Sequence, residues 1–357
     1  MRGLMAAAVA VLISAGGAAH AGEAPRYVVD ASWPQQLPHD WIMGQVGGLA
    51  VDAQDHVWVN QRPRTLTDDE KGAALNPPES KCCVPAPPVM EFDADGKLIQ
   101  AWGGPGQGYD WPEVEHGIFV DTKGFVWVAG NGPKDGQILQ FTRDGKFVKQ
   151  IGHPGPVDSN DTTHLGRPAD IWVDEAAHEV YVADGYGNHR VIVFDSETGA
   201  YKRHWGAYGH RPSDEKLPAF DPKSPQFGNP VHCVQIAPDG LVYVCDRSNN
   251  RIQIFHKDGS FVREWVYEPK SRRAGSTWDL AMAPDATRSL LFNADGTNNE
   301  VRIVDRATGA VLGAFGHNGR NAGEFHWVHQ IAIDSKWNIY TGEVDSGKRV
   351  QKFKRVQ

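Results

Sequence analysis

Residues 169–194, ADIWVDEAAHEVYVADGYGNHRVIVF, contain the pattern that decides the fold. A short alternating strand ends at Asp174, a polar turn follows, and a second strand rich in Val and Tyr begins at Val180. Two short strands joined by a tight polar turn are typical of a β-hairpin. The same beginning recurs six times along the chain, as Gly47–Asp52, His116–Asp121, Ala169–Asp174, His232–Ala237, Trp278–Ala283 and His329–Asp334.

Further strands follow the first hairpin, as on either side of Asp144-Gly145 and of Asp258-Gly259. Four antiparallel strands repeated six times predict an all-β fold, a six-bladed β-propeller, because each small sheet can bury its faces only against neighbouring blades. The sixth copy ends early, whereas Tyr27-Val28-Val29 has no copy of its own. We therefore expect the N-terminal strand to complete the last blade and close the ring, with almost no helix.

The composition of the 357 residues agrees with this fold and excludes several functions. The chain has 39 Gly and 23 Pro for turns, and only 22% of its residues are charged, unlike a disordered chain. Its net charge of -8, without a long basic run, excludes nucleic-acid binding. After the N-terminal stretch no apolar run of about twenty residues occurs, so we expect no membrane span, and we expect a monomer.

The N-terminus has the features of an export signal. Arg2 precedes the apolar stretch Leu4 to Ala15, and Ala19-His20-Ala21 has the small-x-small pattern of a cleavage site. We expect residues 1–21 to be a signal peptide and residues 22–357 to form the propeller, in a periplasmic or secreted protein. The short apolar stretch, with no lipidated cysteine after it, favours a soluble over an anchored form.

Histidine begins alternate copies of the repeat, at His116, His232 and His329. Equivalent positions of a propeller point in equivalent directions, so these imidazoles should converge if the strand starts face the channel. Three imidazoles with one open position suit a catalytic zinc ion. Three unrelated histidines are the competing interpretation in a chain with 15 His, but their repetition at one register favours the metal.

Three more candidate residues follow the second strands of their blades, at Arg62, Tyr186 and Arg247. All three should reach the same face. A phenol beside a divalent cation and guanidinium groups can act as a base, while arginine can bind a carboxylate through two hydrogen bonds. Packing for the tyrosine, and surface or structural roles for the arginines, are the competing interpretations.

The runs Val182–Val191 and Val244–Ile252 resemble those of NHL-repeat propellers. Arg62, the run Asp184-Gly185-Tyr186-Gly187-Asn188 and the three phased histidines together resemble the lyase domain of peptidylglycine α-amidating enzymes. That family cleaves a peptidyl α-hydroxyglycine into a peptide amide and glyoxylate, which implies a small-molecule or peptide-derived substrate. The resemblance implies the following roles: zinc ligands His116, His232 and His329, catalytic base Tyr186, and active-site arginines Arg62 and Arg247.

The resemblance also implies a calcium ion, held in the family by backbone carbonyls and by an acidic residue directly after the last zinc histidine. The two carbonyls correspond to Val46 and Ile118, but Gln330 stands where the acidic residue is expected. The loss of a charge weakens a calcium site, so the sequence predicts zinc more strongly than calcium.

The four cysteines leave several pairings open. Cys233 and Cys245 lie opposite each other across a hairpin, but counting from the turn makes them a hydrogen-bonded pair, whose wider Cα separation suits a disulfide less well. Cys82 and Cys83 could form a vicinal disulfide, pair with the other two, or stay free. They lie in the insertion 63–88, which could fold over the channel mouth.

The sequence therefore predicts an exported zinc-dependent C–N lyase acting on a carbinolamide. Another metal-dependent lyase or hydrolase on the same propeller is one alternative. A non-catalytic NHL-repeat binding propeller is the other, and it predicts no converging metal ligands.

Overall fold

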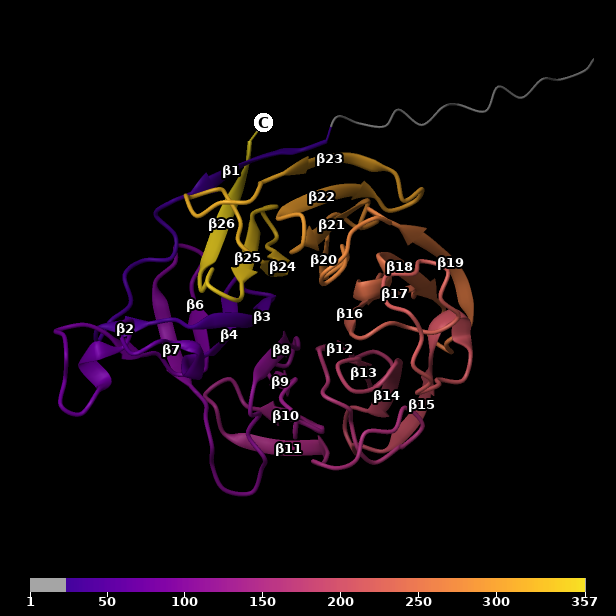
Figure 1. Cartoon of the computed structure of the whole chain (residues 1–357), viewed down its shortest axis with the longest axis horizontal. Coiled ribbons are helices and arrows are strands. Elements are labelled where there is room, and N and C mark those ends of the chain that lie inside the picture. Colours follow the sequence, from indigo (N-terminus) through magenta and orange to yellow (C-terminus); the bar gives the residue numbers. More distant parts are fainter. Residues whose placement is uncertain (1–23, 357) are drawn as a thin grey trace, which may run out of the picture.

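The computed structural model describes residues 24–356, so the predicted signal peptide lies outside the described residues. Six four-stranded antiparallel sheets surround a central axis as the blades of a propeller (Figure 1). Blade one contains β3 (Gln45–Val51), β4 (Val57–Arg62), β6 (Val89–Phe92) and β7 (Leu98–Trp102). Blade two contains β8 (Glu115–Val120), β9 (Val126–Gly130), β10 (Gln137–Phe141) and β11 (Phe147–Gly152). Blade three contains β12 (Asp170–Asp174), β13 (Glu179–Asp184), β14 (Arg190–Asp195) and β15 (Tyr201–Trp205).

The second half of the ring repeats this plan. Blade four contains β16 (Val231–Ile236), β17 (Val242–Asp246), β18 (Arg251–Phe255) and β19 (Phe261–Val266). Blade five contains β20 (Asp279–Met282), β21 (Leu290–Asp295), β22 (Glu300–Asp305) and β23 (Val311–Phe315). Blade six contains β24 (Val328–Ile333), β25 (Ile339–Glu343), β26 (Val350–Val356) and β1 (Arg26–Asp30).

The ring closes as predicted, because the N-terminal strand β1 forms the outer edge of blade six (Figure 1). It pairs antiparallel with β26, with Arg26 opposite Val356 and Asp30 opposite Lys352. The helices of residues 24–356 are four short 3-10 turns, η1 (Pro63–Thr65), η2 (Gly72–Ala74), η3 (Ala207–Gly209) and η4 (Arg247–Asn249). No helix in this part of the chain has the length and apolarity needed to cross a bilayer.

Buried aspartate–arginine pairs fix the loops that leave the second strands of blades three to five. The Nε of Arg190 donates to Asp184 at 2.8 Å, and the Nε of Arg251 donates to Asp246 at 2.7 Å, with all four side chains fully buried. Arg302 makes the equivalent pair with Asp295. A buried charge is tolerated only when it is paired and hydrogen-bonded, so these pairs hold each loop in one conformation.

Cys233 and Cys245 form a disulfide with their Cα atoms 4.8 Å apart. The register of β16 against β17 is regular from the turn back to Cys233 opposite Cys245, as counting predicted, and it shifts directly after that pair, between Cys233 and Val231. The short separation is close to the roughly 4.5 Å of a non-hydrogen-bonded pair, which suits a disulfide better than the wider separation expected from the sequence.

Cys82 and Cys83 form a vicinal disulfide in the insertion 63–88. This insertion adds a two-stranded parallel sheet, β2 (Trp41–Ile42) with β5 (Val84–Pro85). Figure 1 shows this sheet at the outer edge of blade one and not over the axis, so the insertion does not cover the channel mouth in that view. The Nζ of Lys348, from blade six, binds it through the carbonyl of Thr65 at 2.7 Å and through Glu70.

Candidate active site

A β-bulge aims each of the three phased histidines. The strand register shifts at His116 in blade two, at His232 in blade four and at His329 in blade six. The innermost strands of blades three and five pair with their neighbours without such a shift. An extra residue in one strand redirects its side chain, so the bulges turn these imidazoles toward a common point.

The three imidazoles meet, with one candidate ligand atom from each lying within 4.8 Å of the others. Their ring centroids are 5.0, 4.7 and 4.8 Å apart. The Nδ1 of His116 donates to the carbonyl of Ala169 at 2.6 Å, and the Nδ1 of His232 donates to the carbonyl of Trp278 at 2.5 Å. A carbonyl can only accept a hydrogen bond, so the Nε2 atoms of these two rings keep their lone pairs.

The three histidines are neutral at pH 7. Burial lowers the pKa of each imidazole well below its ordinary value. The positive charges of Arg62 and Arg247 lower all three pKa values further, and neighbouring imidazoles of the triad also lower those of His232 and His329. A neutral imidazole is the form that binds a transition metal. A metal ion would therefore not have to displace a proton from these rings in order to bind.

Tyr186 reaches the triad from the loop after β13. Its Oη lies 3.1 Å from the Nε2 of His116 and 3.1 Å from the Nε2 of His232. The Asp184–Arg190 pair holds both ends of this loop, and Asn229 donates to the Tyr186 carbonyl at 2.7 Å. Gly185 precedes the tyrosine because a Cβ at that position would lie 2.0 Å from the carbonyl oxygen of Val231.

The two predicted arginines lie at the same place. The Nη1 of Arg247 donates to the Tyr186 Oη at 3.1 Å, and its Cζ lies 4.3 Å from the ring centroid of Trp278. The Nε of Arg62 donates to the carbonyl of Glu115 at 2.7 Å, and its Nη1 donates to the Oε1 of Gln45 at 3.0 Å. The structure thus brings all six predicted side chains together, while their chemical roles stay predictions.

Two residues of the site were missed by sequence reasoning. The Cζ of Arg167 lies 5.9 Å from the ring centroid of Tyr186, on a loop that precedes blade three. Trp278 packs beneath Arg247 and beside His329, whose ring centroid is 5.7 Å away. The sequence indicates these two residues only by their place in the repeat. Trp278 begins the fifth copy, and Arg167 stands just before the third.

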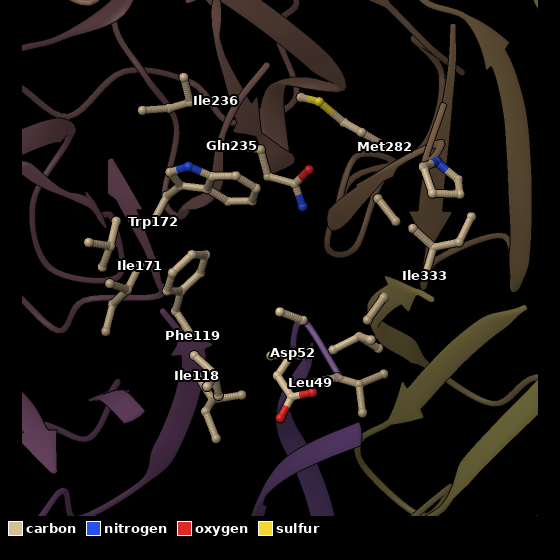
Figure 2. Close-up of a pocket in the computed structure, with 18 of the residues that line it drawn as sticks. Leu49, Asp52, Ile118, Phe119, Ile171, Trp172, Gln235, Ile236, Met282 and Ile333 are labelled. Atoms are coloured by element: carbon tan, nitrogen blue, oxygen red, sulfur yellow. The ribbon is translucent and has the colours of Figure 1, made fainter. Parts of the chain in front are cut away.

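A cavity of about 730 Å³ lies along the axis beyond the triad. Its walls are formed by later residues of the innermost strands, with Phe119, Trp172, Ile236 and Met282 among those in Figure 2. Asp170 and Asp279 also line it, and burial raises the pKa of both carboxyls. The histidines begin the innermost strands, so the cavity and the triad occupy different levels of the channel.

The predicted calcium position lies between these levels. Gln330 and Ile118 line the cavity, but Gln330 brings no charge. Asp170 accepts the Val234 backbone N–H at 3.0 Å, and Asp279 accepts the Ile331 N–H at 2.9 Å. Calcium needs six to eight oxygen ligands with anionic groups among them. Because Gln330 stands where an acidic residue is expected, the donor set of Val46, Ile118 and Gln330 has no anionic oxygen and fits calcium less well than the triad fits zinc.

A second cluster with metal-ligand residue types contains Asp52, His56 and Glu91. The guanidinium of Arg143 fills it, with its Nη2 2.7 Å from Asp52 and 2.9 Å from the Nδ1 of His56, and paired also to Glu91. A cation therefore already neutralises these carboxylates. The cluster is an ion-pair network between blades one and two.

Fold and site together define a six-bladed β-propeller with a buried histidine triad. The NHL repeat model matches residues 165–194 and 231–255, which confirms the repeats. The chain is 26% identical over 336 residues to the peptidyl-glycine alpha-amidating monooxygenase B of Xenopus laevis, covering 88% of this chain and 34% of that protein. It thus spans about a third of that relative's length.

Two other relatives differ in what their names state. A probable peptidyl-alpha-hydroxyglycine alpha-amidating lyase of Caenorhabditis elegans is 27% identical over 217 residues, covering 60% of this chain and 56% of that protein. NHL repeat-containing protein 3 of Mus musculus is 26% identical over 352 residues, covering 93% of this chain and 85% of that protein. These similarities, at 26–27% identity, confirm the resemblance to amidating enzymes that the motifs indicated.

The fold is shared with solved structures. Virginiamycin B lyase from Staphylococcus aureus superposes with a TM-score of 0.53 at 14% identity, covering 93% of this chain and 100% of that one. Such low identity indicates a common fold and nothing about a common substrate.

Proposed function

We propose that this protein is an exported zinc-dependent lyase that cleaves the C–N bond of an N-acyl α-hydroxyglycine, giving an amide and glyoxylate. The observation that carries the proposal is the meeting of three neutral, buried imidazoles with a phenol oxygen and two arginines. The similarity to a protein named as an amidating lyase supports the reaction class. Export rests on the sequence of residues 1–21 alone.

The donor set of the triad fits zinc. Three neutral imidazole nitrogens, joined by no other His, Cys, Asp or Glu ligand within residues 24–356, correspond to a catalytic zinc site with an open position. His116, His232 and His329 would hold the ion, and the carbonyls of Ala169 and Trp278 would orient two of the rings. Bound zinc would supply a Lewis acid for the substrate hydroxyl. The weakened calcium site at Val46, Ile118 and Gln330 remains a secondary proposal.

Tyr186 is the proposed base. Its Oη lies at the triad, 3.1 Å from the Nε2 of His232, and accepts a hydrogen bond from the Nη1 of Arg247. When the phenolate takes the hydroxyl proton, the O–H electron pair becomes the second C–O bond of glyoxylate. The C–N electron pair leaves with the nitrogen, which takes up a proton to complete the amide.

Arg62 and Arg247 are the proposed carboxylate ligands. The Nη2 of Arg62 and the Nε of Arg247 are buried and have no hydrogen-bond partner among the described residues. A buried guanidinium donor without a partner is costly, and a carboxylate would satisfy it. Binding the carboxylate of the hydroxyglycine would orient its hydroxyl toward Tyr186.

The test is the metal content of the purified protein together with glyoxylate release from an N-acyl α-hydroxyglycine. We expect one zinc ion per chain and steady turnover. His232→Ala should lose both and stay folded, because the blades supply the core. His178→Ala, which changes an exposed histidine, is the matched control and should keep both. A zinc-loaded protein that releases no glyoxylate would contradict the proposal.

A second candidate is a non-catalytic binding propeller. The observation in its favour is the match to NHL repeat-containing protein 3, which extends over 93% of this chain. In that case the protein would release no glyoxylate, and His232→Ala would not change the binding of its partner. The same assay therefore separates the two candidates.

A further inference from the structure

The site contains more positive charge than one substrate carboxylate requires. The Cζ atoms of Arg247 and Arg167 lie 5.5 and 5.9 Å from the centroid of the same Tyr186 ring. Arg62 is close enough for its charge to lower the pKa values of the triad. Three guanidinium groups, from the end of β4, from the segment before β12 and from η4, therefore surround one small region.

None of these three arginines forms an ion pair within residues 24–356. Arg167 donates from its Nε to the carbonyl of Asn131 at 2.8 Å, and Arg62 and Arg247 bind only neutral groups or the phenol. The chain pairs its structural arginines differently, because Arg190 and Arg251 each meet a buried aspartate. Arginines left without a carboxylate at one place indicate an anionic ligand.

The nearby acids form no ion pair with these three arginines, although the charge of Glu115 acts on Arg62. Glu115 pairs with Arg64 at 3.2 Å and accepts the Trp111 indole N–H at 2.9 Å, and burial raises the pKa of its carboxyl. Asp135 is occupied by the backbone N–H groups of Glu113, Val114 and Gly132. The hydrogen bonds and the ion pair of these acids go to other groups, so the guanidinium donors of the three arginines stay available to a substrate.

Arg167 is held firmly in place. Its backbone N–H donates to the Asp135 carbonyl at 2.9 Å, and its own carbonyl accepts the Tyr186 N–H at 3.3 Å. Its φ of 61° lies in the left-handed region, which a non-glycine residue adopts at a cost of about 1 kcal/mol or more. A backbone hydrogen bond thus joins the loop that carries Tyr186 to the backbone of Arg167. The half-buried guanidinium of Arg167 extends from this fixed backbone.

We propose that Arg167 binds a second anionic group, so that the preferred substrate is a dianion, an N-acyl α-hydroxyglycine whose acyl part carries its own carboxylate. This inference rests on the proposed function for the first carboxylate, which Arg62 and Arg247 bind. Arg167 lies on a separate loop beside the same tyrosine. Its guanidinium supplies further N–H donors, which are not needed for the first carboxylate because Arg62 and Arg247 bind that group. The class includes hydroxyglycine adducts of dicarboxylic acids and of acidic peptides.

Binding of inert analogues tests the inference without turnover. N-glutarylglycine carries two carboxylates, whereas N-pentanoylglycine has the same chain length and one. Calorimetry on the zinc-loaded protein should give about tenfold tighter binding of the dianion, since a charge-assisted hydrogen bond contributes about 1.5–3 kcal/mol. Arg167→Gln should remove this difference and leave the affinity for N-pentanoylglycine within about twofold.

Arg263→Gln is the matched control, because Arg263 also stacks on an aromatic ring, that of Trp265, but lies on the outer strand β19. It should keep the preference for the dianion. Equal affinities for the two analogues in the wild-type protein would overturn the inference. So would an equal loss of both affinities in Arg167→Gln, because Arg167 would then only position Tyr186.

Turnover separates this inference from the proposed function. Glyoxylate release from N-pentanoyl-α-hydroxyglycine, without a preference for the glutaryl form, would refute the second anion site and keep the lyase. Selective binding of the dianionic analogue, without glyoxylate release from either substrate, would support the anion site and contradict the lyase.

Discussion

Tyr186→Phe separates a base from a packing residue. The substitution removes one oxygen, which lies 3.1 Å from two imidazole nitrogens and from the Nη1 of Arg247. The ring stays, and with it the contacts to His116 and His232 at centroid distances of 5.1 and 5.7 Å. All three candidate zinc ligands are unchanged, so we expect the variant to bind zinc with the same stoichiometry.

The expected loss is kinetic. A positioned base contributes at least about a hundredfold to the rate, which corresponds to roughly 2.7 kcal/mol of activation free energy. Losing the hydrogen bond from Arg247 should lower the free energy of unfolding by only about 1 kcal/mol, and Tm by a few degrees at most. Metal analysis, thermal unfolding and glyoxylate release measure the three quantities on one preparation.

Two results would refute this reasoning. Unchanged turnover in Tyr186→Phe would mean that another group takes the hydroxyl proton. Loss of zinc would mean that the phenol serves the metal site, and the rate could not then be assigned to proton transfer. His178→Ala, at an exposed position, should change none of the three quantities.

Three further predictions concern stability and metal selection. Gln330→Asp restores a charge at the predicted calcium position, so millimolar calcium should raise the Tm of the variant by some degrees and leave the wild type unchanged in thermal unfolding. Burial raises the pKa of Asp279, so the folded state holds its proton more tightly than the unfolded state does. The free energy of unfolding should therefore fall as pH rises from about 4 toward the raised pKa, by up to about 1.4 kcal/mol per pH unit, and Asp279→Asn should reduce this slope in denaturant titrations. Arg190→Met leaves the Asp184 carboxylate buried and unpaired, which should cost about 3–5 kcal/mol in chemical unfolding. Adding Asp184→Asn should restore part of that loss, and a single variant as stable as the wild type would contradict the paired-charge account.

The fold could be predicted because its information is local and repeated. In each hairpin, apolar and polar residues alternate along the strands and a polar turn joins them, which predicts the hairpin locally. With six copies, the faces of each blade can be buried only against neighbouring blades. The convergence of His116, His232 and His329 followed from register alone. The bulges that aim them carry no sequence signal, and counting from the turn gave the pairing of Cys233 with Cys245 but not their Cα separation of 4.8 Å.

Arg167 shows why the rest of the site was not predicted. Its place beside Tyr186 depends on a left-handed backbone conformation and on hydrogen bonds between loops of two blades. These contacts are not periodic, so neither spacing nor composition indicates them. Irregular loops carry most of the chemistry of such a scaffold, and they are the part that repeats predict least.

Because β1 and β26 come from opposite ends of the described chain, blade six cannot form until residues 350–356 have been synthesised and have found residues 26–30. His329 belongs to that blade, so the triad is completed by the last event of ring closure. A nascent chain would carry at most two of the three imidazoles in finished blades. If the protein crosses a membrane unfolded, the zinc ion that we propose for the triad would have to be acquired at the destination.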